Sequence, residues 1–352
     1  MRAFVYNSQP SRVVFRVGGL DELGEEIERL GAHRALVLCT PEQRASAEDV
    51  SKRLGERSAG VYDKAAMHVP LETAEAARVV AMALNADCCV AIGGGSTIGL
   101  GKAIALTSDL PILAIPTTFA GSEMTPIYGI TADGQKKTGR DPRVQPKTVI
   151  YDPLLTMTLP AEIAGPSGMN AIAHCVEALY AQDANPITSL MAEAGIHALA
   201  SSLPVVVAQP DNLEARAEAL YGAWLAGACL GNVGMAIHHK LCHTLGGSYN
   251  LPHAQTHTVI LPHAVQYNLD AAPVAMARIS GALDGVEAAA GLYDLARKIG
   301  APLALRDIGM KAESLDDAAR RATQNPYYNP RPIEYAAIRQ LLQNAWEGAR
   351  PG

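Results

Sequence analysis

The hydrophobic positions of this chain follow two patterns, and the change between them lies near residue 155. Before it, short uninterrupted apolar runs alternate with stretches whose apolar residues recur every three or four positions. Such runs predict buried strands, and such stretches predict amphipathic helices. The predicted strands are 13–17, 35–39, 60–63, 88–92, 112–115, 126–131 and 147–152, and the predicted helices are 20–30, 42–55, 72–85 and one that follows residue 95. This alternation is typical of a doubly wound α/β domain with a parallel sheet.

From Leu159 onward the chain is rich in alanine and helical in pattern almost to its end, without a convincing strand. This pattern predicts an all-α bundle, with one long helical run from Asn212 to Leu245. A chain of 352 residues is long enough for two domains with full cores. We therefore expect an α/β domain at residues 1–155 and an all-helical domain at residues 156–352.

The composition excludes several classes of protein. A hydrophobic content of 49% with 18% charged residues is that of a globular chain. The net charge of −6 and the lack of a basic block argue against a nucleic-acid partner. No apolar run approaches the ~20 residues that span a bilayer, and the N-terminus lacks the apolar region of a signal peptide. The six cysteines are scattered without C-x-x-C spacing, which fits free thiols in a reducing cytoplasm.

A glycine-rich turn follows one of the predicted buried strands. Strand 88–92 runs directly into Gly93–Gly95, Ser96 and Thr97, and a helix follows. Ligands of doubly wound sheets bind at the carboxyl ends of the strands. Backbone amides in such a turn can approach a pyrophosphate, and the helix dipole favours the anion. The alternative is a tight turn that binds nothing, because the spacing is not that of the G-x-G-x-x-G fingerprint.

Three further segments add polar groups around this framework. The segment 116–123 ends the next strand and offers hydroxyl donors to the same crevice. Residues 135–143 read as a basic loop, which is either solvated or in contact with an anion. The segment 325–332, Asn-Pro-Tyr-Tyr-Asn-Pro-Arg-Pro, is either a cover for a site or a packed connection before the last helix.

Six of the ten histidines fall between residues 238 and 263. His239 and His243 stand four apart and share one helix face. The Gly246-Gly247 pair can end that helix, so that His253 folds back towards the same space. Clustered imidazoles are usually metal ligands or acid–base groups. Taken singly, His238 and His263 fit better as buried core residues.

Four ordered blocks of residues resemble the iron-containing alcohol dehydrogenase family, and within it the maleylacetate reductase branch. The blocks are Gly93–Ser96 with Lys102, Pro116–Thr118 with Gly121–Glu123, Gly168–Met169 with His174, and His239 with His243 and His253. The resemblance covers essentially the whole chain. It implies a dehydroquinate synthase-like architecture, with an N-terminal Rossmann-like parallel-sheet domain and a C-terminal helical bundle.

The resemblance also implies a nicotinamide cofactor, NADH or NADPH, with its ring at an interdomain cleft. The residues expected to bind it are Thr40, Gly94, Gly95, Ser96, Thr97, Thr117, Thr118, Ser122 and Lys137. Relatives that select NADH carry an Asp after the second strand to bind the ribose hydroxyls. Thr40 follows that strand here, so we expect NADPH to be accepted as well.

Metal-using relatives bind iron or zinc through one Asp and three His, which correspond to Asn170, His174, His239 and His253. Asn170 is a neutral amide, so we expect nothing to offset the charge of a divalent cation among three neutral imidazoles. This departure agrees with the metal-independent branch of the family, and we expect that no metal is required. Three histidines can still bind zinc, which keeps a metal site as the alternative.

The resemblance implies NAD(P)H-dependent reduction of the enone C=C of maleylacetate to 3-oxoadipate, in the breakdown of aromatic compounds. We expect His243 and His253 to be catalytic, supplying the proton and the oxyanion contacts. The residues expected to bind the dicarboxylate substrate are Asn170, His174, His239, Phe119 and Arg331. We also expect a cytoplasmic homodimer without membrane or nucleic-acid partners.

Three alternative functions stay open at this point. A metal-dependent alcohol dehydrogenase reducing a small carbonyl compound would use the same fold with a bound ion. A lyase of the dehydroquinate synthase type would need more basic phosphate-binding residues around the helical site. A non-catalytic cofactor-binding or filament-forming protein would not need the intact histidine cluster.

Overall fold

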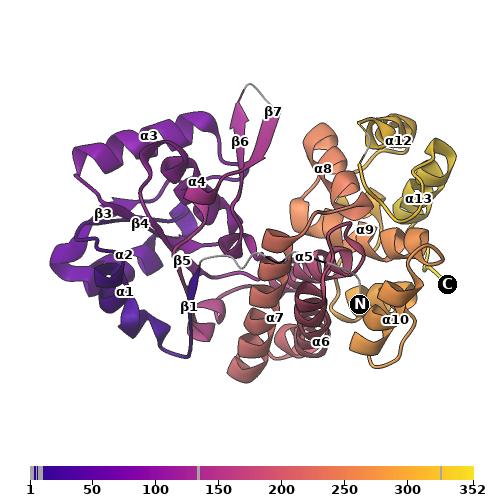
Figure 1. Cartoon of the computed structure of the whole chain (residues 1–352), viewed down its shortest axis with the longest axis horizontal. Helices are drawn as coiled ribbons and strands as arrows, with labels where there is room; N and C mark the ends of the chain where they lie inside the picture. Colours follow the sequence, from indigo (N-terminus) through magenta and orange to yellow (C-terminus); the bar gives the residue numbers. More distant parts are fainter. Residues whose placement is uncertain (1–3, 5, 7–10, 133–134, 326) are drawn as a thin grey trace. The chain divides into compact units, whose positions relative to one another are not determined.

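A computed structural model describes residues 4, 6, 11–132, 135–325 and 327–352 of the chain. Two compact units part between Leu159 and Pro160. Our predicted boundary lies at residue 155, slightly before this point. Each unit has its own core and its own architecture (Figure 1).

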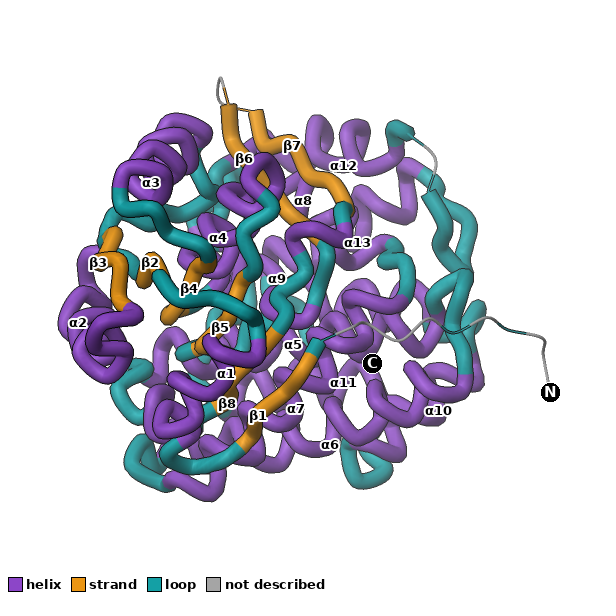
Figure 2. The backbone as a smooth tube through the Cα atoms, turned by 60° about the vertical axis from the view of Figure 1, so that its left-hand side comes forward, coloured by secondary structure: helices purple, strands orange, loops and turns teal. Residues whose placement is uncertain are grey.

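The α/β unit is built on a six-stranded sheet in which every pair of neighbouring strands is parallel (Figure 2). The strand order is β1-β8-β5-β4-β2-β3. The strands are β1 (Arg12–Phe15), β2 (Ala35–Leu38), β3 (Ser58–Tyr62), β4 (Cys88–Gly93), β5 (Ile112–Pro116) and β8 (Thr148–Tyr151). The predicted α/β class with a parallel sheet is confirmed.

Helices cover both faces of this sheet. Along β2, Ala35 and Val37 pack in one core with α1 (Leu23–Arg29) and α2 (Arg44–Leu54). Leu36 and Leu38 belong to a second core, with α3 (Leu71–Ala83) and α4 (Gly95–Ser108). Successive side chains of a strand point to opposite faces, so a wholly apolar strand requires cover on both sides.

A separate antiparallel hairpin contains much of the segment that we predicted as a basic loop. It consists of β6 (Ile127–Ala132) and β7 (Gln135–Arg140), with Ile130 opposite Lys137. The prediction of a loop was therefore wrong for residues 135–140. Backbone pairing with β6 makes this segment a strand, and its run of charged residues does not reveal that partner.

The second unit is helical throughout its described residues, which confirms the predicted class. Its helices are α5 (Ala161–Tyr180), α6 (Pro186–Ala208), α7 (Leu213–Asn232), α8 (Ile237–Tyr249), α9 (His253–Asn268), α10 (Pro273–Ala282), α11 (Ala288–Lys298), α12 (Leu315–Thr323) and α13 (Tyr335–Glu347). Every residue of α5 from Ala164 to Tyr180 is buried. This helix is therefore the centre of the bundle, with α6, α7 and α9 packed around it.

The long helical run predicted from Asn212 to Leu245 is wrong, because the chain bends by 95° between α7 and α8. Val233 is extended at the end of α7. The Gly246-Gly247 pair does not end α8 as predicted; the helix runs to Tyr249 and ends at Asn250, in the left-handed conformation with φ +54°. Helical periodicity continues through the bend, so the pattern alone does not show it.

One helix, α6, has the length and mean hydropathy of a membrane-spanning helix, and the bent pair of α7 and α8 passes the same test together. In this structure α6 packs against α5 and α7.

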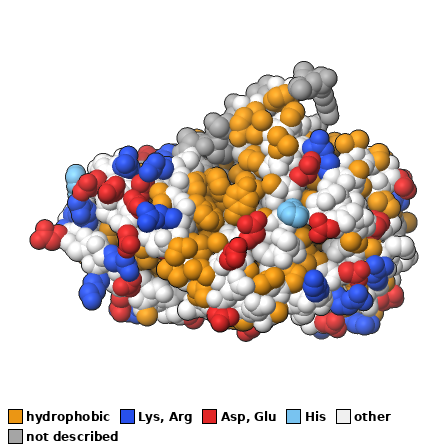
Figure 3. Space-filling view, turned by 90° about the horizontal axis from the view of Figure 1, so that it is seen from below, with side chains coloured by type: hydrophobic (Ala, Val, Ile, Leu, Met, Phe, Trp, Pro, Cys, Tyr) orange, Lys and Arg blue, Asp and Glu red, His pale blue; other side chains and the backbone are white. Residues whose placement is uncertain are grey.

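Hydrophobic side chains also gather on one face of the surface (Figure 3). Over the whole surface of the helical unit, the exposed large hydrophobic residues include Ile163, Leu190 and Val274. The expected homodimer and the expected lack of a membrane partner stay predictions.

Buried His263 on α9 makes the native state sensitive to acid. Its residue is 4% exposed, and burial lowers the pKa of its imidazole to about 4. Below pH 6.5 this imidazole binds a proton in the unfolded chain but stays neutral in the folded protein. The free energy of unfolding therefore falls as the pH drops from 6.5 to about 4. This residue alone should remove up to about 3 kcal/mol over that window.

Urea unfolding followed by circular dichroism between pH 7 and pH 5 measures this loss. The His263→Phe variant should lose less stability over the same range than the wild type, whatever its stability at pH 7. Exposed His33→Gln serves as the control and should keep the wild-type slope, because water surrounds that ring in both states. Equal slopes in His263→Phe and wild type would contradict the assignment.

Candidate active site

Three helices of the second unit bring the predicted histidines together. Asn170 and His174 lie on α5, His239 and His243 on α8, and His253 at the start of α9. The rings of His174 and His239 stack with centroids 5.1 Å apart, and His239 lies 6.0 Å from His243. His257, one turn after His253, lies 4.4 Å from it and 5.0 Å from His239. The sequence-predicted cluster is thus one group in space.

The cluster has a buried part and an exposed part. Asn170, His174 and His239 are 4%, 3% and 6% exposed. His243 and His253, the two residues predicted to be catalytic, are exposed. A substrate can therefore reach the two predicted acid–base groups from solvent, while the other side chains form the floor beneath them.

Glu177 is the residue that the sequence analysis missed. It lies on α5, one turn after His174, and is fully buried. Its carboxylate accepts hydrogen bonds from the backbone N–H groups of Ala236 (2.9 Å), His238 (2.7 Å) and His239 (3.4 Å). It also contacts Nδ1 of His239 at 2.7 Å. These contacts satisfy the otherwise unpaired amides at the start of α8, and the helix dipole favours an anion there.

Glu177 corrects our expectation that nothing near the imidazoles offsets a positive charge. With Nδ1–H donated to this carboxylate, His239 presents Nε2 to the rest of the cluster. The spacing was a usable signal, since residues 170, 174 and 177 fall on one face of a helix. The charge pattern gave no reason to single out Glu177 among the other acidic residues.

Several polar atoms in the buried part of the cluster have no partner within the protein. They are Oδ1 of Asn170, Nδ1 of His174, Nε2 of His239 and Nε2 of His257. Burial also holds the pKa of His174, His238 and His257 well below the usual histidine range, so these rings are neutral at pH 7. Unpaired buried polar atoms are costly, and a polar ligand would satisfy them.

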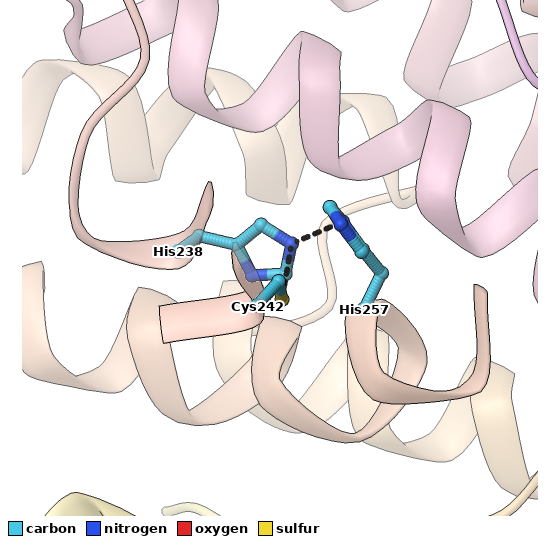
Figure 4. A group of neighbouring side chains, drawn as sticks. All are labelled: His238, Cys242 and His257. Carbon is cyan, nitrogen blue, oxygen red and sulfur yellow. Dashed lines mark hydrogen bonds between the residues drawn. The ribbon is translucent and has the colours of Figure 1, made fainter. Parts of the chain in front are cut away.

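The expected metal ligands do not form a converging set. Among the described residues, the His, Cys, Asp or Glu group whose ligating atoms lie within 4.8 Å of one another is His238, Cys242 and His257 (Figure 4). The family set around Asn170, His174 and His239 is not such a group. A neutral amide and imidazoles that do not converge do not fit the divalent metal that the resemblance implies.

The α/β unit holds the predicted cofactor residues at the carboxyl edge of its sheet. Gly93 ends β4 with φ +153°, and a Cβ there would lie 2.5 Å from Oγ1 of Thr97, so only glycine fits. Gly94 lies against Thr118, since a Cβ on Gly94 would meet that side chain at 3.0 Å. Nothing lies within 4 Å of the corresponding position on exposed Gly95.

These features fit a pyrophosphate. Helix α4 begins at Gly95 without a side-chain cap, and the buried hydroxyl of Thr97 has no partner. Half-buried Ser96 lies between them. An uncapped helix N-terminus with hydroxyls and a bare glycine is the arrangement that binds phosphate groups in this fold class.

Lys102 joins the two predicted cofactor segments. Its ammonium group is fully buried on α4 and donates to the backbone oxygens of Ser122 (2.6 Å), Thr125 (2.8 Å) and Ile127 (2.8 Å). Burial lowers its pKa to about 7, against the raising effect of buried Glu123. The segment that carries Ser122 is thereby tied to the helix that begins at the glycine turn.

The remaining predicted cofactor residues differ in their settings. Thr117 accepts a hydrogen bond from Nε2 of Gln43 at 2.7 Å, a neighbour that no sequence motif indicated. Thr40 directly precedes the short 3₁₀ turn after β2, at the same edge of the sheet. Lys137 is exposed on β7, in the separate hairpin. A cofactor role for Thr40 and Lys137 stays a prediction.

Two of the residues expected to bind the substrate, Phe119 and Arg331, are engaged elsewhere. The Arg331 guanidinium lies 4.3 Å over the ring of Tyr267 and donates to the Tyr267 carbonyl at 3.3 Å. Asn329 pairs with Asn268, so this part of the segment is a packed connection. The Phe119 side chain is completely buried in the α/β unit, so only its backbone could reach a ligand.

Comparison with known proteins identifies close relatives over the whole chain. Residues 10–153 match the model of iron-containing alcohol dehydrogenases, and residues 165–346 match the C-terminal model of the same family. A maleylacetate reductase of Burkholderia cepacia is 58% identical over 351 residues, covering 100% of both chains. A maleylacetate reductase of Sphingobium indicum is 55% identical, covering 99% of both.

Solved structures of maleylacetate reductases are also similar to the whole chain. Maleylacetate reductase from Agrobacterium tumefaciens is 54% identical with a TM-score of 0.97, and the match covers 100% of both chains. The enzyme of the same name from Rhizobium sp. strain MTP-10005 is 53% identical, also with a TM-score of 0.97 and full coverage of both chains. The chain therefore belongs to the iron-containing alcohol dehydrogenase family.

Proposed function

We propose that this oxidoreductase reduces the enone C=C of maleylacetate to 3-oxoadipate, with NADH or NADPH as the reductant. The observation that carries the proposal is the 58% identity to a maleylacetate reductase over 100% of both chains. The histidine cluster supports it, because an unpaired buried ring nitrogen such as Nδ1 of His174 can donate a hydrogen bond to an anionic substrate.

The reaction makes three demands on the protein. Hydride addition to the alkene carbon β to the ketone produces an enolate, whose oxyanion needs stabilisation and whose α-carbon needs a proton. The bound nicotinamide supplies the hydride. The chain itself must hold a dianion, supply donors to the oxyanion and deliver one proton.

His243 and His253 are placed to meet the second and third demands. Both are exposed at the edge of the cluster, where solvent can return the proton that one of them gives up. The other donates to the enolate oxygen. A donor aimed at an oxyanion contributes about 3 kcal/mol to the stabilisation of the transition state.

The buried side chains form the anion-binding floor. His174 and the amide of Asn170 are neutral donors, as the resemblance led us to expect. His239 gives Nδ1–H to Glu177, which fixes the orientation of its ring within the cluster.

We infer that turnover needs no metal ion. The amide at residue 170 and the lack of converging ligand atoms around His174, His239 and His253 support this inference. We also infer a cytoplasmic enzyme, acting as a homodimer on a small dicarboxylate without nucleic-acid or membrane partners. The six cysteines are all buried and free of disulfides, which suits a reducing compartment.

The loss of nicotinamide absorbance tests the function directly. We expect rapid oxidation of NADH or NADPH with maleylacetate, and little with simple aldehydes and ketones. Exhaustive chelation should leave the maleylacetate rate unchanged, and added zinc or iron should not raise it. No turnover of maleylacetate would sink the proposed substrate, and loss of activity on chelation would sink only metal independence.

Alanine at His243 or His253 should lower kcat about 100- to 1,000-fold, because each variant removes a donor that acts in the transition state. The KM for the cofactor should change little, since its predicted contacts lie in the α/β unit. Steady-state kinetics at saturating substrate measures the effect, with exposed His197→Ala as the control. Full turnover in both active-site variants would refute the assignment.

Glu177→Gln should lower kcat about 10- to 100-fold, the usual cost of losing a residue that orients a functional histidine. The amide removes the negative charge and turns an N–H group towards the amides of α8. Glu162→Gln, an exposed change on the same helix, is the matched control and should behave as wild type. If Glu177→Gln kept wild-type kcat with a normal melting midpoint, Glu177 would be a structural cap alone.

A further inference from the structure

His257 is a buried imidazole beside the predicted site that the proposed mechanism leaves unused. It is fully buried on α9, and its ring lies among those of His253 (4.4 Å), His239 (5.0 Å) and His174 (6.5 Å). Its Nε2 has no partner within the protein. A side chain in this position is either a core residue with an unpaired nitrogen or part of the site.

Its other nitrogen is bound to a second histidine. Nδ1 of His257 lies 2.9 Å from Nε2 of fully buried His238, and Sγ of Cys242 lies 3.7 Å from the same Nε2 (Figure 4). Two imidazole nitrogens on one tetrahedral zinc ion stand about 3.3 Å apart. The observed separation is that of a direct hydrogen bond between the rings.

Two tautomers could form this bond, and the one in which His238 donates agrees better with the surroundings of the two rings. If His257 carried it, the remaining hydrogen of His238 would sit on Nδ1, which is buried in the core without a partner. The single lone pair on Nε2 of His238 would then also face the thiol of Cys242 as well as the N–H of His257. With His238 as the donor, the unpaired hydrogen is on Nε2 of His257, beside the rings of the site.

Both rings are fully buried and meet through one nitrogen each. A ring nitrogen that accepts a hydrogen bond carries no hydrogen, so the bond from His238 places the hydrogen of His257 on Nε2. No positive charge has to be buried to create this donor. The pair is therefore a preset hydrogen-bond donor beneath His239 and His253.

We propose that His257 is a substrate-binding residue whose Nε2–H donates to a carboxylate of the dianion, and that His238 is the residue that positions it. The proposal rests on the proposed function and extends it. Maleylacetate carries two carboxylates, and Arg331, which we expected to bind the substrate, is held against Tyr267. Nε2 of His257 has no partner within the protein and can take over such a contact.

Two polar substitutions at His257 separate the roles of its nitrogens. The amide of His257→Asn reaches the place of Nδ1, so it keeps a partner for His238 and loses the donor at Nε2. The amide of His257→Gln reaches the place of Nε2 and keeps that donor. We expect the KM for maleylacetate to rise about 10- to 100-fold in the Asn variant, the weight of a hydrogen bond to a charged group, and about threefold or less in the Gln variant.

Inhibition by saturated acids identifies the group that is bound. The inhibition constant of adipate, a dicarboxylate, should rise in parallel with KM in His257→Asn, while that of pentanoate, with one carboxylate, should rise much less. At the second position, His238→Gln keeps a donor towards His257 and should stay near wild type, whereas His238→Leu should resemble His257→Asn. Melting midpoints and the dissociation constant of the cofactor should be unchanged in all four variants.

Three outcomes would overturn the inference. One is a wild-type KM for maleylacetate and a wild-type inhibition constant for adipate in His257→Asn. Nε2 of His257 would then contact a buried water or nothing, and not the substrate. Another is equal weakening of adipate and pentanoate, which would indicate general distortion. The third is stoichiometric metal in the purified protein that is lost in Cys242→Ser, because the ion would occupy Nδ1 of His257. Calorimetry with adipate tests His257 even if maleylacetate is not turned over, so the two proposals can fail separately.

Discussion

The histidine cluster depends on one buried carboxylate at the start of α8. Glu177 accepts hydrogen bonds from three backbone amides and contacts Nδ1 of His239, and all of this takes place without solvent. A buried anion is stable only when such donors surround it, and the N-terminus of a helix supplies them. The same contacts hold the first residues of α8 after the 95° bend. They thereby set the direction of the helix face that carries His239 and His243. Helix geometry and site geometry therefore have a common cause.

The distribution of charge around this carboxylate explains how a metal-binding framework suits an anion. Residue 170, where the resemblance leads us to expect an Asp in metal-using relatives, is an amide here. The carboxylate near the cluster is that of Glu177, which contacts the far side of the His239 ring through Nδ1. The floor of the site then consists of neutral imidazoles, kept neutral by burial, and one ring in contact with a carboxylate. Such a floor offers hydrogens to a dianion, whereas a carboxylate at residue 170 would repel it.

The α/β unit solves a separate problem by similar means. Lys102 is a buried cation whose cost is offset by backbone oxygens of one neighbouring segment, and that segment carries the hydroxyls predicted to meet the cofactor. The glycine turn leaves the N-terminus of α4 open to a phosphate. In both units, a fully buried titratable side chain organises the backbone of a segment next to a predicted binding site.

The sequence by itself determined the features that depend on neighbours along the chain. Alternating apolar runs predicted the parallel sheet, alanine-rich periodicity predicted the bundle, and a spacing of four predicted that His239 and His243 share a helix face. Only the tertiary structure decided the pairing of β7, the bend before α8, the Glu177–His239 contact, the His238–His257 bond and the engagement of Arg331. Each of these joins residues that a local pattern treats independently, such as 177 and 239. Their energies arise when packing removes water from both partners, and no periodicity along the chain records that event.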